Sequence, residues 1–200
     1  MAQPITGLIL AGGKSTRLGT DKVVLPLSGR TLLARMVTLA SRFCPQVWIS
    51  GRNPENLDVN APWLPDDQPG MGPLGGILTG LQRIGGPLLV LACDLPLLDE
   101  ATVSKLLAAR EQRPAQAVMT TFLQPDTGFI ESLVAVYEQD AQPLLAVAGQ
   151  QGLLKLSRAV PPEVRHHVPY SQQEATVFFN INYPADLALL HKVQSLEHAG

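Results

Sequence analysis

The residues that could bind an anion follow a short apolar run near the N-terminus. Residues 8–10 are apolar, the run stops at Gly12-Gly13, and the polar segment that follows carries Arg17 and Lys22. Small residues let backbone N–H groups approach anionic oxygens, and successive N–H groups in a turn form an anion-binding concavity. The pattern therefore predicts a buried strand that opens into a phosphate-binding loop, with cations nearby to neutralise charge.

The spacing excludes two well-known phosphate-binding motifs. The motif G-x-x-x-x-G-K-[ST] ending in Gly13-Lys14-Ser15 would need a glycine where Leu8 stands. The dinucleotide motif G-x-G-x-x-G is also absent, because neither Gly12 nor Gly13 has its partners at the required spacing. The segment therefore belongs to neither of these two classes of phosphate-binding loop.

A second candidate is the loop of glycines and prolines that begins at Asp66. It contains Gly72 and Pro73 and leads directly into a helical pattern over residues 74–84. The N-terminus of a helix binds phosphates or the edge of a base through its free N–H groups. Asp66 either accepts hydrogen bonds from a nucleobase or caps a turn.

A third candidate is Asp94, which follows the most apolar segment of the chain, residues 88–92. A carboxylate there lies at the carboxyl edge of the predicted sheet, and Pro96 prevents the strand from continuing. Mg²⁺ takes one or two protein carboxylates together with substrate phosphates and water, so one aspartate is sufficient. The alternative is a turn or a helix cap.

The fourth candidate is the pair Asn180 and Asn182. If this segment is extended, the two side chains point to the same side and present two amides to one ligand, and Pro184 then starts a terminal helix. The alternative is that both asparagines satisfy local backbone groups.

Alternating helical and strand patterns position these candidates. Thr31 and Asp99 are expected helix N-caps. Residues 51–73 lack periodicity and are expected to be mostly loop. We expect helices over residues 32–40, 74–84 and 100–110 and near 143–148 and 153–158, and strands over 8–10, 47–50, 88–92, 117–119 and 133–137. The pattern predicts one α/β domain, residues 1–200, with a three-layer α/β/α, Rossmann-like, mostly parallel sheet that binds its ligand at the carboxyl ends of the strands.

Composition limits the classes of function. A formal net charge of -2 argues against a protein devoted to nucleic acid, and no apolar run approaches the roughly 20 residues of a membrane helix. The N-terminus shows no signal peptide, and Cys44 and Cys93 have no metal-ligand spacing, so we expect two buried, reduced thiols in a cytoplasmic protein.

Taken together, the motifs resemble those of the molybdenum cofactor guanylyltransferases, which have the fold of the nucleotidyltransferase (nucleotide-diphospho-sugar transferase) type. From Ile5 to Leu190 the chain carries, in order, Leu-Ala-Gly-Gly-x-Ser-x-Arg-Leu-Gly-x-Asp-Lys, Gly-Pro-Leu-x-Gly, Cys-Asp-x-Pro and Phe-x-Asn-x-Asn-x-Pro-x-Asp-Leu. Residues 130–137 also resemble the family segment Glu-Pro-Leu-x-x-x-Tyr, with Ser132 in place of proline. Four motifs in one order are far more specific than any single motif.

The resemblance implies a role for each matching position. Lys22 contacts the phosphates of GTP, Asp94 binds Mg²⁺ and GTP, and Arg17 and Lys22 neutralise charge during the reaction. Asn180 and Asn182 match positions associated with the pterin substrate. A nucleotide contact after the second strand falls on Ser50 or on Asn53. The implied nucleotide-binding residues are Leu10, Ala11, Gly12, Gly13, Lys22, Ser50, Asp66, Gly72 and Asp94.

The implied reaction is attack by the terminal phosphate of molybdopterin on the α-phosphorus of GTP, which gives a guanine dinucleotide and pyrophosphate. Implied partners are other proteins of molybdenum cofactor biosynthesis and acceptor molybdoenzymes, without nucleic acid or membrane. Three alternatives stay open at this stage: a cytidylyltransferase acting on the same pterin, a sugar-phosphate nucleotidyltransferase, and a nucleotide-binding protein without turnover.

Overall fold

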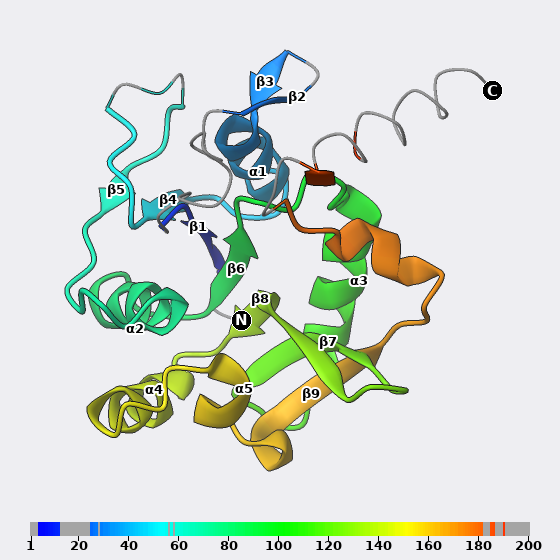
Figure 1. Ribbon diagram of the computed structural model, residues 1–200. Coiled ribbons are helices and arrows are strands. Elements are labelled where there is room, and N and C mark those ends of the chain that lie inside the picture. The colour runs from blue at the N-terminus through cyan, green and yellow to red at the C-terminus, as the bar shows by residue number, and fades with distance from the viewer. Residues whose placement is uncertain are drawn as a thin grey trace.

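A seven-stranded sheet forms the centre of the computed structural model, which describes residues 4–12, 25–27, 29–55, 57, 59–181, 185–186 and 190 (Figure 1). The strand order is β5-β4-β1-β6-β8-β7-β9. Its strands are β1 (Thr6–Leu10), β4 (Val47–Ser50), β5 (Trp63–Leu64), β6 (Leu88–Ala92), β7 (Met119–Gln124), β8 (Phe129–Tyr137) and β9 (Arg165–Pro169). A separate hairpin joins β2 (Pro26–Leu27) to β3 (Arg30–Thr31).

Most pairings in the sheet are parallel, as predicted. β1 pairs in parallel with β4 and with β6, β4 with β5, and β7 with β9. β8 is the exception, because it runs antiparallel to both of its neighbours, β6 and β7. The carboxyl ends of β1, β4 and β6 therefore meet at one edge, and the N-terminal end of β8 arrives at that same edge.

Helices cover both faces of this sheet, which confirms the predicted three-layer architecture (Figure 1). One layer contains α1 (Leu32–Ala40) and α3 (Glu100–Glu111), and the other contains α2 (Pro73–Arg83), α4 (Ala141–Gln150) and α5 (Leu156–Ala159). Successive strand residues serve opposite layers: Ile9 packs in the core with α1 and α3, whereas Leu8 packs in the core with α2 and α4. Such strands, buried on both faces, are continuously apolar.

The helix caps behave as predicted. The Thr31 side chain accepts a hydrogen bond from the Ala34 N–H at 3.1 Å, and the Asp99 carboxylate accepts one from the Thr102 N–H at 2.8 Å. Each bond satisfies a backbone donor that has no partner within the first turn of the helix.

Several predicted element boundaries were wrong. β7 begins at Met119 and continues to Gln124, because Thr120 and Thr121 are buried although they are polar. β8 begins at Phe129 rather than at residue 133, and α5 is shorter than the predicted helix. Residues 51–73 are mostly loop, as predicted, with the two-residue strand β5 within them. Residues Glu174–Phe178 form a 3₁₀ helix directly before Asn180. A second 3₁₀ helix, Pro162–Val164, precedes β9.

Cys44 and Cys93 are both buried, as expected, and neither is part of a disulfide. Across the described part of the chain, no helix has the length and apolar character that a membrane crossing requires.

Candidate functional site

A cavity of about 580 Å³ lies where β1 and β4 end and α2 begins. Six of the predicted nucleotide-binding residues line it together: Leu10, Ala11, Gly12, Ser50, Asp66 and Gly72. Gly51, Arg52, Gly70, Pro73 and Gly76 complete its wall. The structure thus brings together residues from three segments that are far apart in the sequence, and we call this space the nucleotide-side cavity.

Backbone glycines form the floor of the nucleotide-side cavity. Gly51 has a φ of +93°, a region that L side chains rarely adopt, and a Cβ there would lie only 2.7 Å from the Cα of Gly12. The Ala11 N–H donates to the Ser50 carbonyl at 2.9 Å and holds the two segments together. The absence of a side chain at residue 51 therefore lets the segments that follow β1 and β4 pack directly against each other in the cavity wall.

Asp66 shapes the loop that leads into α2. Its Oδ1 accepts a hydrogen bond from the Gln68 N–H at 2.9 Å and a longer one from the Thr79 hydroxyl at 3.4 Å. The turn-capping alternative is thus realised in the structure, while Asp66 also lines the cavity. α2 starts at Pro73 at this cavity wall, and no acidic residue belongs to its first turn. The Asp66 carboxylate lies beside that turn, since a Cβ on Gly75 would be 3.2 Å from its Oδ1.

A second cavity, of about 690 Å³, adjoins the first, and Pro73 lines both. It exists because β6 and β8 separate: their ladder ends at the pair Leu91 and Val134, and continuing the same register would place Asp94 opposite Glu131. Asp94 and Glu131 instead line the space between the two strand ends. We call it the acceptor-side cavity, because Asn180, which was predicted to contact the pterin that accepts the nucleotide, also lines it.

Asn180 lies in the acceptor-side cavity with Asp94. The two segments are tied together, since the Ile181 N–H donates to the Asp94 carbonyl at 3.0 Å. The Asn180 Oδ1 is buried and accepts no hydrogen bond from any residue that the structure describes. An amide oxygen in this state is available to a ligand donor or a cation.

Glu131 is held from two sides. The Tyr170 hydroxyl donates to its Oε1 at 2.7 Å, and the Thr121 hydroxyl donates to its backbone carbonyl at 2.9 Å. Burial raises the pKa of the Glu131 carboxyl above its ordinary value, and the Tyr170 hydrogen bond opposes part of this rise. The result is a fixed carboxyl group in a partly desolvated cavity wall.

With this geometry in place, comparison with known proteins identifies the family. Residues 7–168 match the MobA-like NTP transferase domain family. The chain belongs to this family. It is 30% identical, over 98% of its length, to a probable molybdenum cofactor guanylyltransferase of Carboxydothermus hydrogenoformans, of which it covers 99%. It is 36% identical, over 75% of its length, to a molybdenum cofactor biosynthesis bifunctional protein of Synechocystis sp., of which it covers 44%.

A solved structure of the same family has the same fold. The crystal structure of molybdopterin-guanine dinucleotide biosynthesis protein A from Archaeoglobus fulgidus matches with a TM-score of 0.76 and 25% identity, over 96% of this chain and 99% of that one. The predicted resemblance is confirmed, and the chain is a nucleotidyltransferase of the MobA-like family.

Several predicted site residues of this MobA-like chain lie outside the described residues, namely Gly13, Arg17, Lys22 and Asn182. Their roles stay predictions. Of the two candidates after β4, Ser50 lines the nucleotide-side cavity, whereas Asn53 hydrogen-bonds within its own turn to Glu55. The geometry therefore favours Ser50 for the nucleotide contact.

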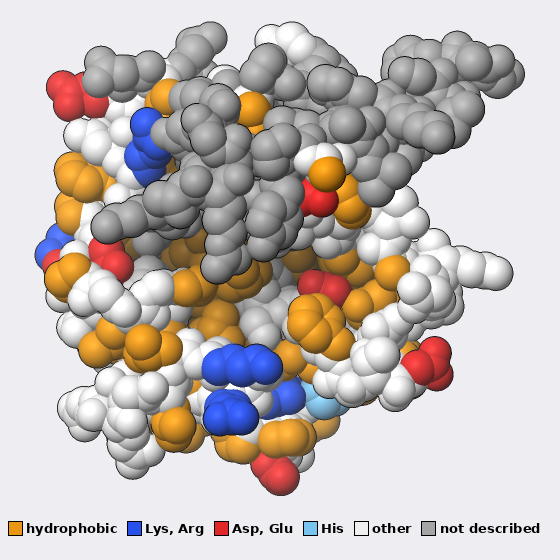
Figure 2. All heavy atoms as spheres, viewed as in Figure 1, with side chains coloured by type: hydrophobic (Ala, Val, Ile, Leu, Met, Phe, Trp, Pro, Cys, Tyr) orange, Lys and Arg blue, Asp and Glu red, His pale blue; other side chains and the backbone are white. Residues whose placement is uncertain are grey.

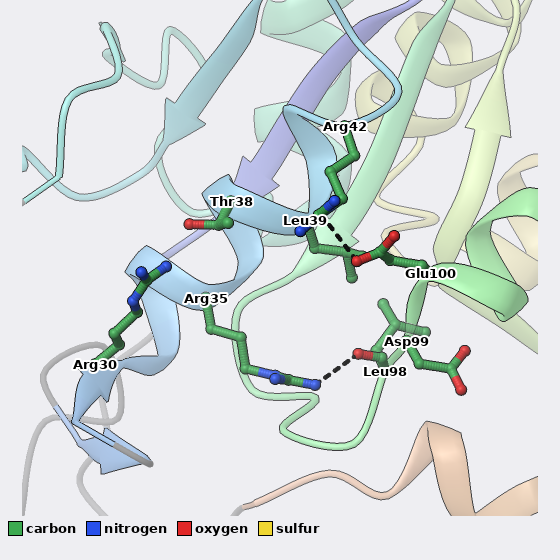
Figure 3. Close-up of a pocket in the computed structure, with 8 residues that line it drawn as sticks. All are labelled: Arg30, Arg35, Thr38, Leu39, Arg42, Leu98, Asp99 and Glu100. Carbon is green, nitrogen blue, oxygen red and sulfur yellow. Dashed lines mark hydrogen bonds and ion pairs between the residues drawn. The ribbon is translucent and has the colours of Figure 1, made fainter.

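A third cavity, of about 300 Å³, lies between α1 and the start of α3 and contains none of the predicted site residues (Figure 3). Two of its three arginines make structural bonds: the Arg35 guanidinium donates to the Leu98 carbonyl at 3.0 Å, and Arg42 pairs with Glu100 at 2.8 Å. Both contacts tie α1 to the connection between β6 and α3, so we interpret this cavity as a helix junction.

Sequence reasoning missed three features of the site. Arg52 lines the nucleotide-side cavity, and its position just after a strand end was the available signal. Lys155 lines the acceptor-side cavity, and Figure 2 shows Lys and Arg side chains gathered over α5 below the central hollow. Glu131 was noted only as part of a motif, although a charged residue within an apolar strand pattern is itself a signal.

Proposed function

We propose that this chain transfers the GMP group of GTP to the terminal phosphate of molybdopterin and releases pyrophosphate. The observation that carries the proposal is the pair of adjoining cavities at one edge of the sheet. The predicted nucleotide residues line one cavity, Asp94 and Asn180 line the other, and Pro73 lines both. Two substrates bound in this way would meet at the boundary between the cavities.

The nucleotide-side cavity suits a nucleoside triphosphate. Gly12, Gly51 and Gly72 place main chain without side chains on its wall, and α2 begins at the same wall with the positive end of its dipole. Arg52 adds a cation to the same wall. Lys22 and Arg17 are expected to add charge on the phosphate side, as the family motif implies.

The donor set around Asp94 fits Mg²⁺. Asp94 offers a carboxylate and Asn180 offers a buried amide oxygen, and hard oxygen donors of this kind, completed by substrate phosphates and water, are those that Mg²⁺ prefers. When bound, the cation would offset the negative charge of the phosphates. Across the described residues there is no cluster of three or more His, Cys, Asp or Glu side chains for a metal, so the substrate phosphates would have to complete the coordination.

The chemistry needs no dedicated base in the protein. A phosphate monoester has a second pKa of about 6 and is largely dianionic near neutral pH. One of its oxygens forms a bond to the α-phosphorus of GTP, and the bond from that phosphorus to the bridging oxygen of the β-phosphate breaks. The residues of the chain act by positioning both substrates and by stabilising charge on the departing pyrophosphate.

Pyrophosphate release by the purified chain tests the proposal. Molybdopterin and Mg²⁺ would be mixed separately with GTP, CTP, UTP and ATP, and we expect release with GTP to exceed release with the other nucleotides. Preference for CTP would identify a cytidylyltransferase. GTP binding measured by calorimetry, without any pyrophosphate release, would identify a nucleotide-binding protein and would overturn the proposal.

A further inference from the structure

The proposed transfer assigns a task to Asp94 but none to Glu131, the other carboxylate that lines the acceptor-side cavity. Glu131 lies on β8 at the register position opposite Asp94, where the ladder between β6 and β8 has already ended. Its side chain is half-buried. A half-buried carboxylate in the wall of a substrate cavity loses hydrogen bonds to water when a ligand binds. Hydrogen-bond donors on the ligand have to replace them.

The surroundings of Glu131 fix its orientation before any ligand arrives. Tyr170 donates to Oε1 at 2.7 Å, and the Tyr170 ring is itself buried between aromatic neighbours. Its centroid lies 4.7 Å from that of Phe178 and 6.3 Å from that of Phe122, the latter in an edge-to-face arrangement. Phe178 lines the same cavity. The carboxylate is thus presented by a rigid aromatic support rather than by a flexible chain.

A carboxylate has about four acceptor positions, and Tyr170 occupies one of them. The remaining positions suit a ligand with two parallel N–H donors, because carboxylates pair best in bidentate geometry. The rest of the cavity suits a flat ring: Phe129, which is 57% exposed, and Leu154 are large apolar side chains on its wall. A planar heterocycle with a ring N–H beside an exocyclic amino group meets both requirements.

We propose that Glu131 binds the N–H and amino edge of the acceptor's 2-amino-4-oxo ring, and that Tyr170 is a positioning residue for this carboxylate. The inference rests on the proposed function, which supplies a pterin as acceptor. Guanine carries the same edge, but the predicted guanine nucleotide residues line the neighbouring cavity. Glu131 therefore selects the acceptor and not the nucleotide.

The first test is Glu131→Gln in the full chain, assayed by pyrophosphate release with varied molybdopterin and varied GTP. Glutamine has the same shape and can still accept the Tyr170 hydrogen bond, but its amide N–H₂ opposes the ligand donors. Because the variant loses hydrogen bonds between the ligand and a charged group, we expect the KM for molybdopterin to rise about tenfold to a hundredfold. The KM for GTP should not change. The value of kcat should stay within about threefold, because the contact stabilises the bound substrate and the transition state equally. Glu111→Gln, an exposed carboxylate outside both cavities, is the matched control.

Tyr170→Phe tests the positioning role separately. The ring and its aromatic contacts remain, and only the hydroxyl is lost. We expect a smaller rise in the KM for molybdopterin, about threefold to tenfold, without a change in kcat. A variant that merely loosened the fold would instead lower kcat and the GTP response together.

Two small ring compounds test which edge of the pterin ring Glu131 binds. Pterin and lumazine differ in that lumazine carries an oxygen in place of the 2-amino group. Pterin should compete with molybdopterin at least about tenfold better than lumazine, because a site built for an amino donor rejects an analogue without it. The difference should disappear in Glu131→Gln.

The outcomes separate this inference from the function on which it rests. An unchanged molybdopterin KM in Glu131→Gln, or equal competition by pterin and lumazine, would overturn the inference and leave guanylyl transfer intact. A rise in the GTP KM with loss of preference for GTP over ITP would assign Glu131 to guanine instead. A shift only in the Mg²⁺ requirement would assign it to the cation. Failure of the unaltered chain to release pyrophosphate would overturn the proposed function itself.

Discussion

A methyl group on Gly76 would lie 2.6 Å from the Ser50 hydroxyl oxygen, so α2 can approach the carboxyl end of β4 only because residue 76 has no side chain. Ser50 is buried, and both residues line the nucleotide-side cavity. The contact therefore links the packing of a helix against the sheet to the shape of a ligand site.

We predict that Gly76→Ala weakens GTP binding and destabilises the fold by about 1–3 kcal/mol, the usual cost of overpacking a rigid contact. Calorimetry and urea unfolding measure the two effects. Gly149→Ala is the control, because its new methyl group would meet the flexible side chain of Met71 rather than a strand. Equal stability and equal GTP affinity for both variants would show that α2 can move away without consequence.

Asp94→Asn should lower the rate of pyrophosphate release roughly 10²-fold or more, in line with the loss of a single charge-stabilising group. The chain should still fold, because asparagine preserves the shape of the side chain. Asp126→Asn, which alters an exposed carboxylate between β7 and β8 outside the cavities, should leave the rate unchanged. Near-normal turnover of Asp94→Asn at saturating Mg²⁺ would remove Asp94 from the reaction.

The buried ion pair between Arg110 and Glu138 is expected to matter far more for stability than an exposed pair. Arg110 donates to both carboxylate oxygens at 2.8 and 3.0 Å, and the two side chains are only 13% and 11% exposed. Glu138→Gln should cost about 3 kcal/mol, because it leaves a buried cation without its counter-charge.

The exposed pair of Arg42 and Glu100 is the matched comparison. Its side chains are 60% and 56% exposed, so solvent screens the attraction. Glu100→Gln should change the unfolding free energy by less than about 1 kcal/mol. Urea unfolding of both variants measures the two changes in unfolding free energy. Similar decreases for the two variants would show that burial of the ion pair does not set its contribution to stability.

Cys44 should be inert in the folded protein. Burial raises the pKa of its thiol to about 12, an effect that Arg110 partly opposes. The thiolate is the reactive form, so at pH 8 only about one thiol in 10⁴ would be ionised. Alkylation followed by peptide mass spectrometry should label Cys44 after unfolding in urea but not before, and its labelling should increase as the pH rises. Rapid labelling of the native protein at pH 8 would contradict this prediction.

Local elements could be predicted from the sequence because they depend on residues close together in the chain. The caps at Thr31 and Asp99 are bonds to the third residue along, and the uninterrupted apolar run of β6 already indicated a strand covered on both faces. The order of the four motifs was sufficient for the family, since each motif is a continuous segment. Predictions failed where tertiary packing overrode polarity, as at the buried Thr121 of β7.

The arrangement of the site was decided by the tertiary structure. Nothing local to β8 shows that it runs antiparallel beside β6, and yet this pairing, and the point where it ends, places Glu131 in the same cavity as Asp94. The sequence alone determined the family and predicted which residues carry the chemistry of a nucleotidyltransferase. Only the folded sheet sorted the described ones into two adjoining cavities, because strand register depends on contacts between residues that the chain itself keeps far apart.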